Sequence, residues 1–511
     1  MTLEGCDDML TASVVLEPSF TVGPVNRRLF GGFVEHMGRC VYTGLYEPGH
    51  PLADEDGFRT DVLDLVRELG ISVVRYPGGN FVSGYRWEDG VGPAEDRPTR
   101  LDPAWRSVES NQFGLDEFIR WCRKADIEPM LAMNLGTRGT QEAVELWEYC
   151  NHPGGTSWSD LRQKHGAAEP YGVRMWCLGN EMDGPWQLGH KSADEYGRLA
   201  ATTARALRQF DAGLELVACG SSHRQMPTFG SWEATVLEHA YDEVDFISAH
   251  AYYEDKGDTA SFLASSVNMD LFISDVVATA DYVRARLNKT KRINVSFDEW
   301  NVWYLSRVPG QLTSWQPTPR ISEEAYTLAD AVVVGSMLIT LLRHSDRVTS
   351  ACLAQLVNTI SVIRTEPAGP AWRQATFYPF ALTARHARGE VLRVEPTAPT
   401  YSTSLYGDVP VLDATATHDP DSGDIAILVV NRHQHEPVQL EVSTAALGPV
   451  VVQEAVALTG PEPSAANTEH DPNRVTPTPL HAEAEQGTLR VQLPPVSWAC
   501  IRLGDRANTG R

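Results

Sequence analysis

The sequence is short of basic residues. Its 511 residues include 43 lysines and arginines against 67 aspartates and glutamates, which gives a formal net charge of −24 at pH 7. Nucleic acids and anionic membranes attract proteins through lysine and arginine. We therefore expect neither as a partner, and the same charge disfavours a strongly anionic substrate. A neutral small molecule fits this composition best.

Paired cysteine motifs are also missing. None of the eight cysteines forms a CxxC pair, and most lie inside apolar runs. This pattern is typical of reduced, buried thiols rather than of a disulfide framework or a zinc site. No Walker-type phosphate loop occurs, and no dinucleotide-binding glycine motif follows a strand. The sequence thus predicts neither a cofactor nor a metal ion.

Long hydrophobic runs are absent as well. The most apolar stretch, 325–342, is interrupted by Asp330, which indicates a buried helix rather than a membrane span. The first ten residues, MTLEGCDDML, contain neither the basic nor the apolar region of a secretory signal. From these two features we expect a cytoplasmic protein that does not insert into a membrane.

Eight short apolar runs alternate with amphipathic segments over roughly the first two thirds of the chain. The segment 61–69, for example, has its apolar residues at helical spacing and acidic residues before it. Eight strand–helix units predict an α/β fold, the (β/α)₈ or TIM barrel. The runs are 29–37, 71–79, 128–136, 172–180, 214–222, 245–253, 293–301 and 350–358.

The pattern changes after about residue 372. β-like segments then follow one another, separated by turn residues and without a long helix, which predicts an all-β sandwich. We place the barrel at 24–380 and the sandwich at 381–511, and the strand-like residues within 1–23 can pair with the sandwich. The segment 461–484 is predicted to be a surface loop. The β-like segments are 409–418, 423–432, 436–444, 450–459 and 487–503.

Polar side chains stand at the end of almost every run of the predicted barrel. In such barrels the C-terminal ends of the strands form the active-site face. Glu181, in WCLGNEMDGPW, ends the fourth run, and Glu299, in SFDEWNVW, ends the seventh. These strands lie across the barrel mouth from each other, so the two carboxylates can converge as a glycosidase pair. The alternative is that each glutamate is a salt-bridged structural residue.

Several long strings resemble the α-L-arabinofuranosidases of glycoside hydrolase family 51. The resemblance covers about 30–379 and, more weakly, the tail. It implies a (β/α)₈ barrel, a C-terminal jelly-roll-like sandwich, a retaining mechanism and a cytoplasmic homo-oligomer, a hexamer. The strings are FGGFVEHMGRCVYTGLYEPGH, VRYPGGNFVSGYRWEDGVGP, WCLGNEMDGPWQLGH, SAHAYYE, SFDEWNVWY and ACLAQLVNTI.

The resemblance also implies a role for each residue that these strings carry. Glu181 would be the general acid/base, Glu299 the nucleophile, and Asn180 the partner of the sugar 2-hydroxyl. Arg75 would hold the charge of the nucleophile and lower its pKa. The other substrate-binding residues would be Glu35, Asn80, His250, Tyr252, Trp303 and Gln355.

Some of these residues also have ordinary structural roles open to them. Glu35 can form a strand-end ion pair with Arg75, and Asn180 can serve a turn. His250 can be a satisfied structural histidine, and Trp303 can simply pack. The sequence leaves these alternatives open.

For the whole protein, the sequence predicts an exo-acting α-L-arabinofuranosidase that trims short arabino-oligosaccharides inside the cell. Three alternatives stand beside it. The first is another retaining specificity on the same site, such as β-xylosidase or endoglucanase. The second is a non-catalytic carbohydrate-binding protein, and the third is a metal-dependent barrel hydrolase, which chelators would inhibit.

Overall fold

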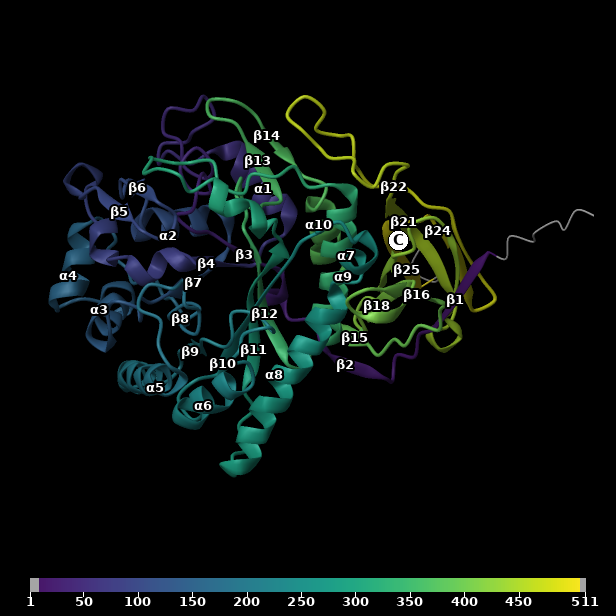
Figure 1. Cartoon of the computed structure of the whole chain (residues 1–511), viewed down its shortest axis with the longest axis horizontal. Coiled ribbons are helices and arrows are strands. Elements are labelled where there is room, and N and C mark those ends of the chain that lie inside the picture. The colour runs from purple at the N-terminus through teal and green to yellow at the C-terminus, as the bar shows by residue number, and fades with distance from the viewer. Residues whose placement is uncertain (1–8, 506–511) are drawn as a thin grey trace, which may run out of the picture.

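A closed barrel of eight parallel strands forms the first part of the molecule. The computed structural model describes residues 9–505, and Figure 1 shows the barrel beside a β-sandwich. Each barrel strand overlaps one of the eight predicted runs, so the predicted fold class is confirmed. In order around the barrel, the strands are β3 (Gly31–Phe33), β4 (Val73–Tyr76), β7 (Glu128–Ala132), β8 (Met175–Leu178), β9 (Glu215–Ala218), β10 (Phe246–Tyr253), β11 (Asn294–Val302) and β12 (Val348–Ala354).

Helices surround the barrel and bury their apolar faces against it. Helix α1, for example, buries Val62, Leu65, Val66 and Leu69 and ends at Gly70, whose φ of 79° suits a residue without a Cβ. Short 3-10 turns occur at 27–30, 80–84, 87–90, 94–96, 305–310 and 445–447. The helices are α1 (Thr60–Leu69), α2 (Leu115–Ala125), α3 (Thr140–Asn151), α4 (Ser157–Lys164), α5 (Ala193–Phe210), α6 (Ser231–Ala240), α7 (Thr259–Leu263), α8 (Ser266–Arg286), α9 (Leu328–Arg343) and α10 (Phe377–His386).

The barrel interior is filled by side chains rather than open. Phe33, Met130, Met175, Val217 and Cys352 form a small buried cluster there, separate from the larger core between strands and helices. This agrees with the packed interior expected of such barrels, and it leaves the mouth as the place for polar groups.

The seven cysteines of the described residues are buried and unpaired, as predicted, while Cys6 lies outside the described residues.

Two sheets pack face to face to form the sandwich. The larger has the order β2-β15-β18-β19-β25-β21-β22 and the smaller β1-β20-β24-β23. Three two-stranded pairs lie outside these sheets: β5 (Arg100–Asp102) with β6 (Ser107–Glu109), β13 (Ile363–Thr365) with β14 (Ala371–Arg373), and β16 (Thr400–Thr403) with β17 (Gly407–Pro410). The sandwich strands are β1 (Leu10–Val15), β2 (Thr21–Pro24), β15 (Glu390–Leu392), β18 (Leu412–His418), β19 (Ile425–Asn431), β20 (Val438–Ser443), β21 (Val450–Leu458), β22 (Thr478–Pro479), β23 (Ala482–Glu485), β24 (Thr488–Leu493) and β25 (Ser497–Asp505).

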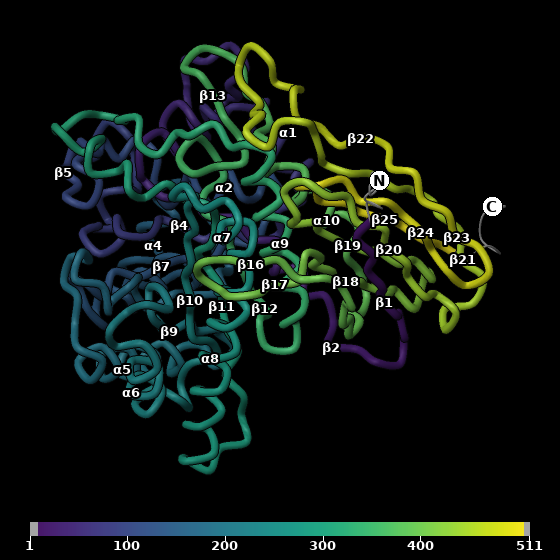
Figure 2. The backbone as a smooth tube through the Cα atoms, turned by 45° about the vertical axis from the view of Figure 1, so that its right-hand side comes forward, coloured from purple at the N-terminus to yellow at the C-terminus, as the bar shows by residue number. Residues whose placement is uncertain are grey.

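The N-terminal segment belongs to the sandwich, as the sequence suggested. It forms two strands rather than one: β1 pairs in parallel with β20, and β2 pairs with β15 in the other sheet. Figure 2 shows the purple β1 lying beside β20. Residues 10–24 therefore help to build both sheets.

Two sequence predictions in the sandwich were wrong in detail. The run 487–503 is two strands in different sheets, β24 and β25, because Pro494 and Pro495 lack the N–H groups that a continuous strand needs. The predicted loop 461–484 ends in strands β22 and β23, which pair with the neighbouring strands β21 and β24. The predicted boundary at 380/381 falls within α10, and β15 is the first sandwich strand after it.

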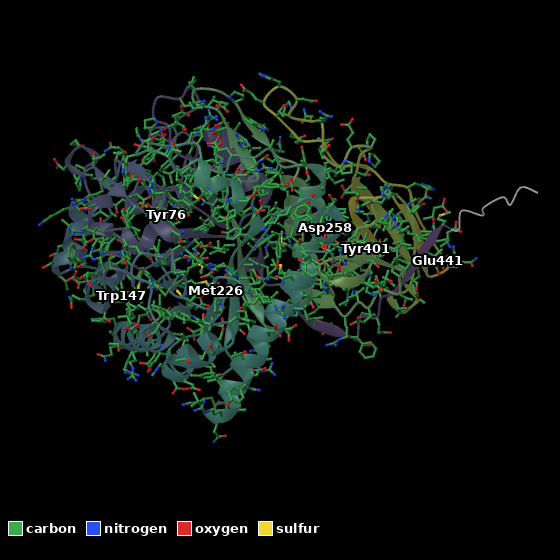
Figure 3. The ribbon with its side chains drawn as sticks, viewed as in Figure 1. Tyr76, Trp147, Met226, Asp258, Tyr401 and Glu441 are labelled. Atoms are coloured by element: carbon green, nitrogen blue, oxygen red, sulfur yellow. The ribbon has the colours of Figure 1, made fainter. Side chains whose placement is uncertain are left out.

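The barrel and the sandwich are joined through α9, the buried helix predicted at 325–342. This helix packs against β18, β19 and β25, and its Gly335 is so close to Trp498 that a Cβ would stand 2.2 Å from the indole. Tyr401 of β16 reaches the barrel side, where its hydroxyl donates to the carbonyl of Ala260 at 3.1 Å (Figure 3 labels Tyr401 beside Asp258).

Within residues 9–505, none of the helices combines the length and apolar character that a membrane crossing requires.

Candidate active site

Glu181 and Glu299 face each other at the barrel mouth. Glu181 lies shortly after β8, the fourth barrel strand, and Glu299 lies in β11, the seventh. One carboxylate oxygen of each glutamate and one ring nitrogen of His250 lie within 4.8 Å of one another. Both glutamates are buried. Their spacing is close to the roughly 5–5.5 Å between the two carboxyl groups of a retaining glycosidase.

Glu181 has an unusual backbone conformation and two hydrogen-bond partners, and it is deeply buried. Its φ of 44° lies in the left-handed region, which is costly for a residue with a Cβ and is often found at functional sites. The indole N–H of Trp186 donates to Oε2 at 2.8 Å, and His250 Nδ1 lies 2.9 Å from Oε1. Burial raises the pKa of Glu181, the charge of Glu299 adds to this rise, and the contact with His250 opposes it. The net direction is upward, as a general acid requires.

The carboxylate of Glu299 is held in position by two donors. Arg75 Nη1 lies 2.7 Å from Oε1, and the hydroxyl of Tyr252 donates to Oε2 at 2.8 Å. Arg75 comes from β4 and is almost fully buried, so this ion pair is shielded from water. The contact of Arg75 with Glu299 that the resemblance implied is present, and Tyr252 adds a second one.

Asp298, which was not predicted from the sequence, completes a buried chain of charges. His250 lies between two carboxylates, with Nδ1 2.9 Å from Glu181 and Nε2 2.9 Å from Asp298. Burial opposes the charged imidazolium, but Glu299, Asp298 and Glu181 outweigh it and raise the pKa of His250 to about 10. A protonated imidazole has no lone pair for a metal ion. The spacing of Glu181, His250 and Glu299 would fit a metal ion, but both ring nitrogens of His250 are already hydrogen-bonded to carboxylates.

Glu35 is tied into the site by neutral donors rather than by an arginine. Its Oε1 accepts hydrogen bonds from the indole of Trp105 at 2.8 Å and the amide of Phe81 at 3.0 Å. Its Oε2 accepts one from the side-chain amide of Gln355 at 3.2 Å. The alternative ion pair with Arg75 is therefore wrong. Burial, aided by the charge of Glu299, raises the pKa of Glu35 to about 8.

The glycines before Asn80 allow the chain to pass close to Glu35. A Cβ on Gly79 would stand 2.7 Å from the Glu35 carboxylate, and one on Gly78 would stand 2.5 Å from its Cγ. Only glycine permits this approach. The turn delivers Asn80 to the edge of a hollow that it shares with Trp186.

Two amide side chains at the mouth have polar atoms without a partner. Asn180 accepts a hydrogen bond from Arg75 Nη2 at 2.7 Å, which leaves its Nδ2 buried and unpaired. Gln355 donates to Glu35, and its Oε1 is likewise buried and unpaired. Native proteins rarely leave such groups unsatisfied. A polar ligand with hydroxyl groups, such as a sugar, would satisfy both.

Trp303 forms a wall of the mouth and is fixed from behind. Its ring lies 4.8 Å from that of Tyr252, and its indole N–H donates to Ser322 Oγ at 2.8 Å. It also packs against the large core, so its framing and packing roles coexist. The ten site residues named from the sequence thus gather at one end of the barrel, while Asp298, Trp105, Trp186 and Ser322 join them unpredicted.

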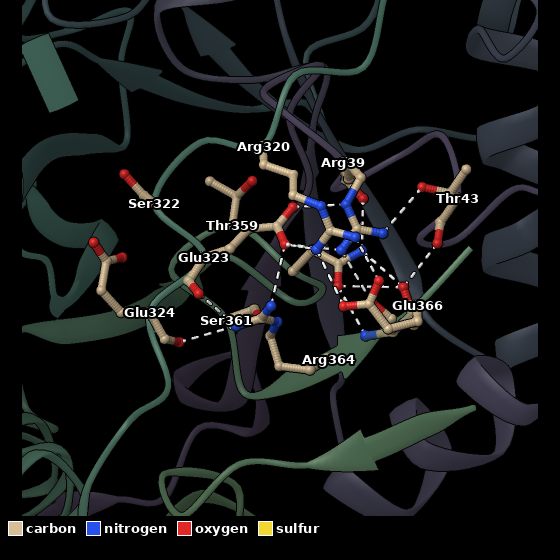
Figure 4. A network of polar contacts seen from close by, with 12 residues as sticks. Arg39, Thr43, Arg320, Ser322, Glu323, Glu324, Thr359, Ser361, Arg364 and Glu366 are labelled. Carbon is tan, nitrogen blue, oxygen red and sulfur yellow. Dashed lines mark hydrogen bonds and ion pairs between the residues drawn. The ribbon is translucent and has the colours of Figure 1, made fainter. Parts of the chain in front are cut away.

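The loop that carries Ser322 is anchored by a network of arginines and glutamates (Figure 4). Arg39 binds the Glu323 carboxylate through two hydrogen bonds of 2.7 and 2.8 Å, and Arg364 binds the same group at 3.1 Å. Arg39 and Glu323 are buried, so the network is shielded from solvent. It holds residue 322, and with it the Trp303 wall, in place.

Comparison with known proteins agrees with this geometry. An α-L-arabinofuranosidase 1 domain matches residues 65–259, and an α-L-arabinofuranosidase C-terminal domain matches residues 298–497. A solved family 51 α-L-arabinofuranosidase from Bifidobacterium longum is 50% identical, with a TM-score of 0.93 over 96% of this chain and 99% of that one. The chain belongs to the α-L-arabinofuranosidases of glycoside hydrolase family 51.

Curated members of family 51 are similar over nearly the whole chain. An intracellular exo-α-(1→5)-L-arabinofuranosidase of Streptomyces lividans is 57% identical and is matched over 98% of this chain and 76% of its own length. An exo-α-(1→6)-L-arabinofuranosidase of Bifidobacterium longum is 53% identical, over 96% of this chain and 97% of its own. A solved α-L-arabinofuranosidase of Thermotoga maritima in complex with arabinose is 34% identical, with a TM-score of 0.86 over 96% of this chain and 99% of that one.

Proposed function

We propose that this protein is a retaining exo-α-L-arabinofuranosidase that hydrolyses terminal α-L-arabinofuranosyl residues by double displacement. The approach of Glu181 and Glu299, with His250 between them within 4.8 Å, is the observation that carries this proposal. The family membership and the buried, unpaired amides of Asn180 and Gln355 support a furanoside as the substrate. The buried mouth favours a terminal sugar over an internal one.

In the first step, Glu299 attacks the anomeric carbon and forms a covalent arabinosyl-enzyme. Glu181 donates its proton to the glycosidic oxygen as the bond to the leaving group breaks. Arg75 and Tyr252 fix the attacking oxygen atoms of Glu299. Burial raises the pKa of Glu181, which favours the protonated form that donates to the leaving oxygen.

In the second step, water replaces the leaving group and attacks the anomeric carbon from the same side. Glu181, now ionised, accepts a proton from that water, and the bond to Glu299 breaks. The arabinose product keeps the configuration of the substrate. The loss of the Glu299 charge in the intermediate lowers the pKa of Glu181, because the neighbouring negative charge has gone.

The natural substrates that we propose are short arabino- and arabinoxylo-oligosaccharides. The two similar relatives are named for different linkages, (1→5) and (1→6), so the linkage is not fixed by family membership. We further propose that the enzyme works in the cytoplasm on products of hemicellulose breakdown and assembles as a homo-oligomer, a hexamer by family resemblance. Light scattering of the purified enzyme would test the assembly.

A comparison of two chromogenic substrates tests the activity. We expect the enzyme to hydrolyse an aryl α-L-arabinofuranoside much faster than an aryl β-D-xyloside, and proton NMR should show the α-anomer of arabinose first. A faster xyloside reaction would point to the other retaining specificity, and a first product of inverted configuration would overturn double displacement. Full activity in EDTA would argue against a metal-dependent hydrolase.

Replacement of Glu181 by glutamine tests the acid role separately. The variant should lose about 10²–10⁴-fold in kcat/KM on substrates with poor leaving groups and much less on activated aryl arabinofuranosides. A uniform loss across leaving groups of different pKa would contradict the assignment of Glu181 as the acid.

A further inference from the structure

A hollow lies next to the active-site mouth, on the side of Asn80 and Trp186. This inner hollow has a volume of about 320 Å³ and is lined by Asn80, Gly84, Pro103, Trp186 and Leu188, among others. Trp186 is the residue whose indole donates to the Glu181 carboxylate. Because Glu181 protonates the leaving oxygen, the hollow lies where the remainder of the substrate must leave the mouth.

A second, outer hollow continues beyond Gly84. It has a volume of about 600 Å³ and lies between the loops that follow β4 and β7, with Gly84, Arg86, Glu88, Thr137 and Arg138 in its lining. Gly84 lines both hollows and also a smaller third one of about 140 Å³. The inner and outer hollows therefore adjoin at this glycine, and together they make up the groove considered below.

The two parts of the groove differ in chemistry as an oligosaccharide would require. The inner hollow presents exposed apolar side chains, because Trp186 is 49% exposed and Leu188 is 44% exposed. Such surfaces pack against the C–H faces of sugar rings. The outer hollow is lined by side chains of both signs, which can bond hydroxyl groups without selecting a charged ligand. A neutral chain of several sugars matches both parts.

The backbone conformation at position 84 does not require a glycine. Its φ lies outside the left-handed region, so a residue with a side chain could adopt the same conformation. A Cβ at this position would point into the inner hollow, 3.3 Å from Leu188 and 3.9 Å from Pro103. The absence of a side chain at Gly84 therefore keeps the groove open.

Arg86 is placed to bind the chain once it has passed Gly84. It is exposed at the outer hollow, and within residues 9–505 its guanidinium makes no hydrogen bond or ion pair. By contrast, the neighbouring Arg138 is paired with Glu88 at 2.5 Å. The donors of Arg86 are thus free for hydroxyl groups of a ligand.

We propose that the leaving-group part of the substrate runs from the mouth through the inner hollow, across Gly84, and into the outer hollow beside Arg86. The enzyme then prefers neutral arabino-oligosaccharides of three or more sugars over the disaccharide. This inference rests on the proposed function and adds to it the length and path of the substrate.

The test measures kcat/KM on α-linked arabino-oligosaccharides from the disaccharide to the pentasaccharide, with an aryl α-L-arabinofuranoside as reference. For the wild-type enzyme, kcat/KM should rise with chain length beyond the disaccharide. Gly84→Leu, which fills the inner hollow, should remove this rise, so that the ratio of tetrasaccharide to aryl kcat/KM falls about tenfold or more. Arg86→Ala should lower the same ratio several-fold.

Matched controls separate the groove from general damage. Gly213→Leu and Arg292→Ala change an exposed glycine and an exposed arginine that precede β9 and β11, at the opposite end of the barrel. Both should retain the wild-type dependence on chain length, and thermal unfolding should confirm that all four variants fold.

Two outcomes are distinguishable. A wild-type kcat/KM that does not change with chain length, or variants at Gly84 and Arg86 with the wild-type dependence, would overturn the groove while leaving the arabinofuranosidase activity intact. Failure of the wild-type enzyme to hydrolyse the aryl arabinofuranoside would instead overturn the proposed function.

Discussion

Two buried clusters of charged side chains in this molecule differ in which sign of charge predominates. At the junction of barrel and sandwich, Asp413 faces two arginines: Arg343 Nη1 lies 2.5 Å away, and Arg432 bonds the second oxygen. Ser336 also donates to it at 2.6 Å. At the mouth, carboxylates outnumber cations. The acidic groups there are Glu35, Glu181, Asp298 and Glu299, and the cationic groups are Arg75 and His250.

The balance decides what each cluster does. At the junction, burial opposes the ionisation of Asp413, but Arg343 and Arg432 lower its pKa overall, so the charge is fully compensated. At the mouth, burial and like charges raise the pKa of Glu181 and bring that of Glu35 to about 8. A cation-rich cluster therefore stabilises the fold, whereas an acid-rich cluster holds protons at a cost in stability.

The sharpest test of this contrast is Glu299→Ala. It should lower kcat by about 10⁴-fold or more, because the nucleophile is gone. It should leave the melting temperature unchanged or higher, because repulsion among the remaining carboxylates is relieved. Azide added to the variant should restore part of the turnover and give the β-configured arabinosyl azide. Wild-type-like rates would end the nucleophile assignment.

Asp413→Asn should show the reverse behaviour. It leaves buried Arg432 without its partner and should cost about 3 kcal/mol of unfolding free energy, at the lower end of the usual range because Arg343 is 26% exposed. The kcat of the folded enzyme should not change. Urea unfolding measures the loss, and Asp424→Asn, an exposed aspartate of the same sandwich, should cost no more than about 0.5 kcal/mol.

The pH dependence of the Asp413 effect has a definite sign. Because the pKa of Asp413 is lower in the folded than in the unfolded protein, its contribution is present above the unfolded pKa near 4 and is lost as the pH falls through the folded value. The difference between wild type and Asp413→Asn should stay constant from neutral pH to about pH 5 and shrink below about pH 4. A difference that grows with acid would contradict the ion-pair explanation.

Asp298→Asn tests whether Asp298 sets the pKa and the position of His250. Without this carboxylate, the pKa of His250, which is about 10, should fall by one unit or more, and kcat/KM should drop about tenfold as His250 loses its fixed position beside Glu181. NMR titration of the imidazole measures the first change. Ser296→Ala, which removes a hydroxyl 3.2 Å from Asp298 but keeps its charge, is the control. An unchanged His250 pKa would show that Asp298 only packs.

The smallest effect is expected at the wall of the mouth, outside the charged cluster. Ser322→Ala removes the acceptor of the Trp303 indole, a loss of about 1 kcal/mol, and should raise KM a few-fold with little change in kcat. Ser314→Ala, in the same loop, should be neutral. A large fall in kcat for Ser322→Ala would mean that the loop does more than hold Trp303.

The sequence predicted what depends on local patterns. Runs of apolar residues located the barrel strands, and the position of Glu181 and Glu299 at strand ends brought them together because parallel strands share one active edge. The run 487–503 was misread because its apolar character continues through Pro494 and Pro495, while the pairing partners that separate its two strands are distant in the chain.

The partners of the catalytic groups could not be predicted in the same way. Trp105 and Trp186 come from loops, and loop conformation is set by contacts that have no local periodicity. Asp298 stands directly before Glu299, and adjacent strand residues normally point to opposite sides, so the pair gave no sign that both meet His250. The presence of Asp298 beside Glu299 inside a buried strand could nevertheless have indicated that Asp298 belongs to the site.

The pairing of β1 with β20 has a consequence for how the chain is made. A ribosome adds about 5–20 residues per second, so the first strand leaves it tens of seconds before its neighbour more than four hundred residues later is synthesised. During that time β1 lacks its partner strand, and β2 gains its own only when β15 is made, after all the barrel strands. Translation must therefore end before the sandwich can close, and a nascent chain cut short anywhere before residue 438 would keep its first strand without a partner.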